Sequence, residues 1–146
     1  MFRKKESDVQ RAVEKIRHAD ELASIRWSAL RLEWLAAAAK QKMGSHPLPV
    51  VRQQYSGHAA ALVDHVQDIR RGLEYFDSCV KNQGNKQMHH LQGIFQGLSS
   101  KGKQISEQAG QMRLIHAIHP EISDITELSR KVVASAGIIM KGHLRR

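Results

Sequence analysis

The chain has 146 residues, of which 23 are Lys or Arg and 14 are Asp or Glu, giving a formal net charge of +9 at pH 7. This length is typical of one domain with its own core, and the single cysteine excludes an intrachain disulfide. No run approaches the ~18 apolar residues that cross a bilayer, and no secretory-type apolar run follows the N-terminus, so we expect a cytoplasmic protein with no membrane partner.

The first predicted helix begins near Ser7 and ends near Lys42. Its apolar residues recur at steps of three and four, so they share one helical face, which we take as the buried stripe. These residues are Val9, Val13, Ile16, Ala19, Ala23, Trp27, Leu30 and Trp34. The helix ends before the segment 44–49, because Pro47 and Pro49 prevent its continuation.

The second predicted helix covers residues 50–82. Its apolar positions follow the alternating steps of four and three that are typical of a coiled-coil seam. They are Leu62, Val66, Ile69, Leu73, Phe76 and Val80. Gly84 is suited to end this helix and Asn85 to cap the next one. Because residues 44–82 carry no net charge, we interpret this helix as structural or as a protein contact.

The third predicted segment covers residues 85–119. Its apolar residues keep the seam spacing, and they are Met88, Leu91, Phe95, Leu98, Ile105, Ala109 and Met112. Several glycines weaken it, and residues 99–103 are its weakest point. A break there predicts five helices, whereas the unbroken register favours continuity. We expect the pair Gly93 and Gly97 to allow close helix packing or close approach of a backbone.

The last predicted helix begins at Pro120, which suits the first turn of a helix. Its buried stripe comprises Ile125, Leu128, Val132, Ala136 and Ile139. Short connections between long amphipathic helices favour antiparallel neighbours. The sequence therefore predicts an all-α fold, in which residues 1–146 form a single up-down helical bundle of four to five long amphipathic helices.

The positive charge is uneven along the chain, with +4 over residues 1–43, +3 over residues 83–119 and +2 over residues 120–146. In the last helix, three cations share an arc opposite the apolar stripe, and they are Arg130, Lys141 and Arg145. In the first helix, four cations share a similar arc, and they are Arg11, Lys15, Arg26 and Lys40. Such rows release counterions when they bind phosphates, although solvated helix faces show the same pattern.

Lys101 and Lys103 flank Gly102, where the backbone is predicted to approach a phosphate closely. The nine histidines include His116 and His119, three residues apart, but neither HExxH nor CxxC accompanies them. We therefore expect no metal site and no cofactor. Because no catalytic motif is present either, we predict that the protein is not an enzyme.

Three stretches share a pattern with one known family. They are Ala12-Val13-Glu14-Lys15-Ile16, then Leu48–Gln54 followed by Gly57 and Ala61-Leu62, and finally Val132–Lys141. Together they resemble the small helical subunit of type III CRISPR effector complexes, which serve in antiviral defence. The chain departs from that family at His58, which stands where Leu is usual, and it lacks the closing Trp.

This resemblance implies a non-catalytic bundle, several copies of which stack along a crRNA-guided filament. It also implies basic faces that contact the guide RNA or the target strand. The sequence is compatible with three functions. The first is a nucleic-acid-backbone-binding subunit of a ribonucleoprotein, with other subunits or copies of itself as partners. The alternatives are a coiled-coil adaptor or chaperone-like interaction module, and a helical enzyme that uses histidine-bound metal.

Overall fold

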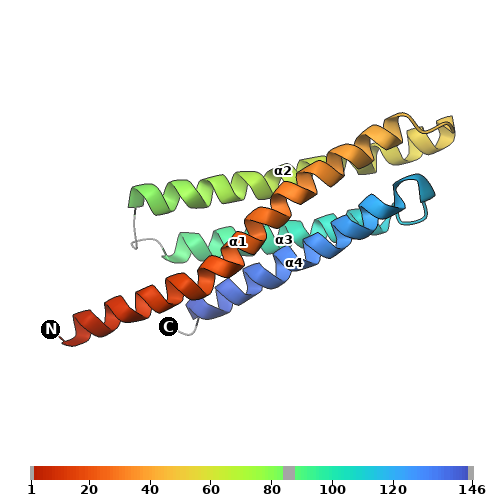
Figure 1. Cartoon of the computed structure of the whole chain (residues 1–146). Coiled ribbons are helices and arrows are strands. Elements are labelled where there is room, and N and C mark those ends of the chain that lie inside the picture. The colour runs from red at the N-terminus through yellow and green to blue at the C-terminus, as the bar shows by residue number, and fades with distance from the viewer. Residues whose placement is uncertain (1, 84–87, 145–146) are drawn as a thin grey trace.

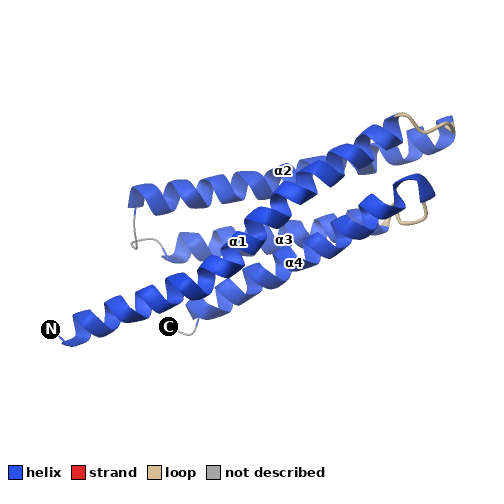
Figure 2. Cartoon of the chain, in the orientation of Figure 1, coloured by secondary structure: helices blue, strands red, loops and turns tan. Residues whose placement is uncertain are grey.

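The computed structural model describes the backbone of residues 2–83 and 88–144, and the side chains of residues 19–79 and 92–141. It contains four long helices, α1 (Phe2–Gly44), α2 (Pro49–Gln83), α3 (Met88–Gly110) and α4 (His119–Leu144), with the short 3₁₀ helix η2 (His116–Ile118) before α4. Consecutive helices run in opposite directions (Figure 1). No strand occurs in the described ranges (Figure 2). The predicted all-α up-down bundle is confirmed.

The four helices are arranged as a square. Each helix packs against the next along the chain, and α4 closes the bundle by packing against α1. Within the described residues, the diagonal pairs α1–α3 and α2–α4 do not pack against each other. Each helix therefore has two neighbours and one face directed away from the core. No helix in the described part has an apolar stretch long enough to cross a membrane.

The seams predicted for α2 and α4 are part of the core, as are Phe95, Leu98, Ile105, Ala109 and Met112 of the seam predicted for the third segment. In α2 the buried seam residues are Leu62, Val66, Ile69 and Leu73, and in α4 they are Ile125, Leu128, Val132, Ala136 and Ile139. Phe76 is partly buried, and its ring packs edge-on against that of Phe95 in α3, with centroids 5.2 Å apart. The side chain of Val80 lies outside the described residues.

The predicted buried stripe of α1 is wrong. Trp27, Leu30 and Trp34 are exposed, as are Ala19 and Ala23. The core side of α1 is formed instead by Ile25, Ala29, Leu32, Ala36, Ala39 and Met43. Three of these six residues are alanines, and the stripe that carries the two tryptophans faces outward. Val9, Val13 and Ile16 lie outside the described side chains.

Several predicted helix ends differ from those observed. α1 begins at Phe2, earlier than the predicted start at Ser7. α3 runs without a break through residues 99–103, in agreement with the favoured alternative, but it ends at Gly110. The predicted third segment extended to His119, and the structure instead turns at residues 111–114 before η2. Met112 and Ile115 are buried in this turn, so the apolar pattern continues although the helix does not.

The prediction of close packing at Gly93 and Gly97 is also wrong. A Cβ added at either position would have nothing within 4 Å. Among the glycines that the structure describes, those in close contact are Gly72 and Gly102. A Cβ at Gly102 would lie 2.7 Å from Cγ2 of Val133 and 3.1 Å from the carbonyl oxygen of Ser129. The tight α3–α4 contact therefore depends on Gly102.

Candidate nucleic-acid interface

The predicted cation row of α4 lies on the surface. Arg130 and Lys141 are both exposed, and neither has an acidic partner among the described residues. They lie on the same side of the helix, about 16 Å apart along its axis. Lys131, beside Arg130, is 4.0 Å from the Glu127 carboxylate and so is partly neutralised. Arg145 lies outside the described residues.

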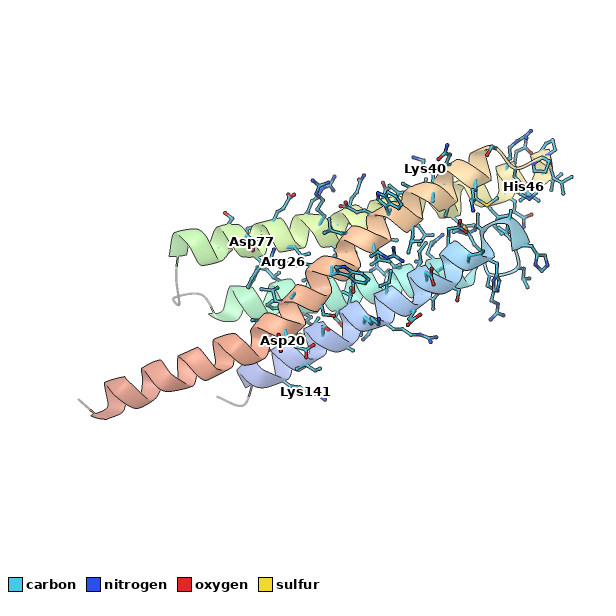
Figure 3. All side chains as sticks on the ribbon, viewed as in Figure 1. Asp20, Arg26, Lys40, His46, Asp77 and Lys141 are labelled. Carbon is cyan, nitrogen blue, oxygen red and sulfur yellow. The ribbon has the colours of Figure 1, made fainter. Side chains whose placement is uncertain are left out.

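The predicted cation row of α1 is directed toward a different part of the surface. Arg26 makes a two-pronged ion pair with Asp77 of α2, in which Nη1 donates to Oδ2 at 2.8 Å (Figure 3). The hydrogen bond from Arg26 lowers the pKa of Asp77. Lys40 is exposed without an ion pair in the described part of the chain, and Arg11 and Lys15 lie outside the described side chains. The described members of the rows on α1 and α4 therefore do not form one continuous surface.

Lys101 and Lys103 do not act as a pair around an open glycine. Lys101 extends toward α2, where its Nζ lies 3.0 Å from Oδ2 of Asp68 and 3.5 Å from Nδ1 of His65. The hydrogen bond from Lys101 lowers the pKa of Asp68. Gly102 is buried inside α3, so its backbone cannot approach a phosphate. Lys103 is exposed on the other side of α3.

A hollow of about 450 Å³ lies where the α3–α4 turn meets α4. Its lining includes the basic residues Arg113 and Arg130 together with His119. Its other lining residues are Ile122, Ser123, Thr126 and Glu127. Two arginines beside hydroxyl groups form a setting suited to a phosphate, since arginine binds phosphate oxygens in pairs. The Glu127 carboxylate shares this lining, and Lys131 lies 4.0 Å from it.

Arg113 and His119 of this hollow are not among the residues predicted to bind nucleic acid. Arg113 lies in the turn after Gly110, within a stretch that was predicted to be helical. Hydrogen bonds of this turn, including one from the Ile115 amide to the Met112 carbonyl at 3.1 Å, bring the chain back toward α4. A prediction that α3 ends at Gly110 would have placed Arg113 in the turn toward α4, near Arg130.

A second hollow, of about 430 Å³, lies farther along the same pair of helices. Lys103 of α3 and Met140 of α4 face it, and Lys141 follows Met140 directly in the chain. The remaining lining residues are polar, namely Gln92, Gln96, Ser99 and Ser100. Amide and hydroxyl groups supply further hydrogen bonds to phosphate or sugar oxygens.

These observations distinguish the sides of the bundle. Between α1 and α2, Arg26 and Arg70 are paired with acids, and between α2 and α3, Lys101 is paired with Asp68. On the outer side of α3 and α4, four cations have no acidic partner among the described residues. We call this set the α3–α4 basic face, and it comprises Lys103, Arg113, Arg130 and Lys141.

The described residues include no group of three or more His, Cys, Asp or Glu side chains placed to hold a metal ion. His58 and His65 are engaged at the α2–α3 interface, where His58 hydrogen-bonds Gln108. Comparison with protein-family models, with characterised proteins and with solved structures finds no match for this chain.

Proposed function

We propose that this protein is a non-catalytic, nucleic-acid-binding subunit that contacts the phosphate backbone through the α3–α4 basic face. The observation that carries the proposal is the clustering of cations without acidic partners on this one face. Elsewhere among the described residues, acids pair with Arg26, Lys42, Arg70, Arg71 and Lys101, whereas Arg31, Lys40 and Arg52 of α1 and α2 have no acidic partner. An excess of positive charge on one face is the electrostatic pattern expected of a backbone-binding protein.

Arg113 and Arg130 would hold one phosphate at the first hollow, and Lys103 and Lys141 would contact others nearer the second hollow. The residues that line the two hollows include no Phe, Tyr or Trp on which a base could stack, and His119 supplies their one aromatic ring. Binding would therefore tolerate different sequences, since phosphate contacts position the strand without identifying its bases.

A small subunit of a larger ribonucleoprotein in the cytoplasm is the setting that we propose for this activity. The guide RNA or the target strand of a CRISPR effector is the partner implied by the resemblance described above. One isolated bundle would bind weakly, because repeated copies and neighbouring subunits supply most of the affinity in a filament. Both RNA and DNA remain candidate ligands, since each presents the same phosphate charge.

Fluorescence anisotropy tests the proposal with labelled single-stranded RNA and DNA of random sequence over a series of salt concentrations. The double variant R113A/R130A should bind more weakly to all sequences and lower the salt slope by roughly two. The matched control is R70A/R71A, which removes the same charge from arginines that are paired with Glu33, Glu74 and Asp68. If both variants weaken binding equally, or the parent does not bind, the α3–α4 basic face is not the interface.

The alternative of a coiled-coil adaptor is favoured by a separate observation, which is the exposed apolar face of α1. This face lies opposite the core side of its helix and includes none of the cations of the α3–α4 basic face. The two functions are compatible for one subunit of an assembly.

A further inference from the structure

The outward side of α1 carries large apolar side chains that nothing in the described structure covers. Trp27 is 57% exposed, Leu30 is 66% exposed and Trp34 is 81% exposed. These three residues share a helical face, since they are three and four residues apart. Contiguous exposed patches of large apolar residues mark interaction sites in folded proteins.

The same side of α1 has the spacing of a coiled-coil seam. We define the outer seam of α1 as the residues that follow steps of three, four, three, four and three, which are Asp20, Ala23, Trp27, Leu30, Trp34 and Ala37. All six are exposed. Because this spacing keeps side chains directed at a second helix over several turns, the pattern indicates a helical partner.

We propose that the outer seam of α1 is the docking surface for a second copy of this chain, with the two α1 helices antiparallel across a two-fold axis near residues 28 and 29. In this register Trp34 packs against Ala23 of the second copy, and Trp27 packs against Leu30. The large ring of Trp34 thus meets the small side chain of Ala23, so this layer and the adjacent layer of Trp27 and Leu30 can interdigitate. A two-fold interface also uses the same patch on both copies, as this surface requires.

The charged residues at the edges of the seam favour this antiparallel register. In a parallel pair, Asp20 would face Asp20 of the second copy inside the interface, and Arg26 would face Arg31 of the second copy. Like charges would then meet at both places. In the antiparallel register, Arg26 lies near Glu33 of the second copy on both sides of the axis, and within each copy these two side chains also pair with Asp77 and Arg70 of α2. Arg31 faces Ser24 instead of another cation. The arrangement therefore places no like charges opposite each other along residues 20–37.

The available area fits a modest but specific dimer. With roughly 250 Å² for a whole Trp, the exposed parts of Trp27, Leu30 and Trp34 supply roughly 450 Å² per copy. Two copies thus bury about 900 Å² from these residues alone, and the alanines and flanking arginines bring the interface past the ~1,000 Å² of specific contacts. A base-stacking role for the two tryptophans is the competing explanation, which the experiment below distinguishes.

Sedimentation equilibrium of the full chain tests the dimer. The parent, of 16.5 kDa, should approach twice this mass at micromolar concentrations, whereas W34E should be monomeric with unchanged helical circular dichroism. L114E is the matched control, because Leu114 is 80% exposed but lies in the α3–α4 turn, and it should remain dimeric. A monomeric parent at 100 µM overturns the proposal. So does a parent whose tryptophan fluorescence is quenched by oligonucleotide while its mass stays that of one chain.

The antiparallel orientation has its own test. A spin label is attached at A19C in a C79A background, and the expected distance between the labels of the two copies is near 30 Å. In this register, residue 19 of one copy and residue 19 of the other are separated by about 28 Å along the helix axis. A parallel pair would bring the labels within ~15 Å, since facing positions of a coiled coil are closely spaced. A short distance would overturn the antiparallel arrangement. The dimer proposal does not rest on nucleic-acid binding. It stands whether or not the R113A/R130A variant still binds oligonucleotides.

Discussion

Gly102 of α3 lies directly against the backbone of α4, such that a Cβ at this position would come within 3.1 Å of the Ser129 carbonyl oxygen. Ser129 itself is buried, and its hydroxyl lies 2.6 Å from that of Ser106, one turn along α3. This contact brings the two helices close together near the middle of their interface. It thereby supports the spacing between Lys103 and Arg130, which belong to the α3–α4 basic face.

Substitution of Gly102 by Ala should lower the free energy of unfolding by about 1–2 kcal/mol, because overpacking outweighs the gain in helix propensity. Val133 is β-branched and has little freedom to move away. Gly97→Ala is the matched control in the same helix, where a Cβ meets nothing within 4 Å. It should raise the free energy of unfolding by about 0.5–1 kcal/mol. Urea denaturation measures both, and equal effects would contradict the close contact.

Two residues of the α2 seam test the core. Leu73→Ala and Phe76→Ala should each destabilise the fold by roughly 2–5 kcal/mol, with Phe76 nearer the lower limit because its ring is only partly buried. The loss at Phe76 includes its edge-on contact with Phe95. Thermal or chemical denaturation provides the measurement. An unchanged midpoint for Leu73→Ala would mean that this residue does not lie in the core.

The ion pair between Arg26 and Asp77 predicts a pH-dependent contribution to stability. The hydrogen bond from Arg26 lowers the pKa of Asp77 below the value of 3.8 that applies to a free side chain. The folded state therefore prefers the ionised carboxylate, so the stabilisation is present above pH 3.8 and is lost as the pH falls through the lowered pKa.

Asp77→Asn should accordingly destabilise the protein at pH 6, and this difference from the parent should shrink below pH 3.8. Urea midpoints measured at several pH values provide the test. Asp64→Asn is the control in the same helix, because Asp64 is exposed and has no ion pair among the described residues. A constant difference for Asp77→Asn down to pH 2 would contradict the role of the ion pair.

The fold could be predicted from the sequence largely because α2 and α4 each have one clear apolar stripe. In α1 the same reasoning failed, since that helix has two apolar sides. The larger residues, Trp27 and Trp34, outweighed the alanines that form part of the core side. Periodicity identifies a face, but packing against α2 and α4 decides which face is buried.

The candidate site could be predicted only in part. Arg130 and Lys141 share one side of α4 by spacing alone, and the structure leaves both exposed. Whether a cation is neutralised depends on residues distant in the chain, as with Arg26 and Asp77, which are 51 positions apart. The contribution of Arg113 depends on where α3 ends, and the apolar pattern continues past that point.

Substitutions at Lys101 and Lys103 distinguish a cation that stabilises the fold from one that binds nucleic acid. The two residues flank Gly102 and carry the same charge. Lys101 is held by Asp68 at 3.0 Å and by Gln104 at 3.3 Å, whereas Lys103 is exposed beside the second hollow. Lys101→Gln should cost about 0.5–1 kcal/mol of stability through loss of the ion pair. Its effect on nucleic-acid binding should be small.

Lys103→Gln should weaken nucleic-acid binding and have little effect on stability. It should leave the free energy of unfolding within about 0.5 kcal/mol of the parent, as expected at an exposed position. It should also lower the slope of binding against salt concentration by roughly one, because one phosphate contact is lost. Denaturation and anisotropy of both variants complete the comparison. If Lys101→Gln lowers the salt slope as much as Lys103→Gln, binding reflects net charge and not the α3–α4 basic face.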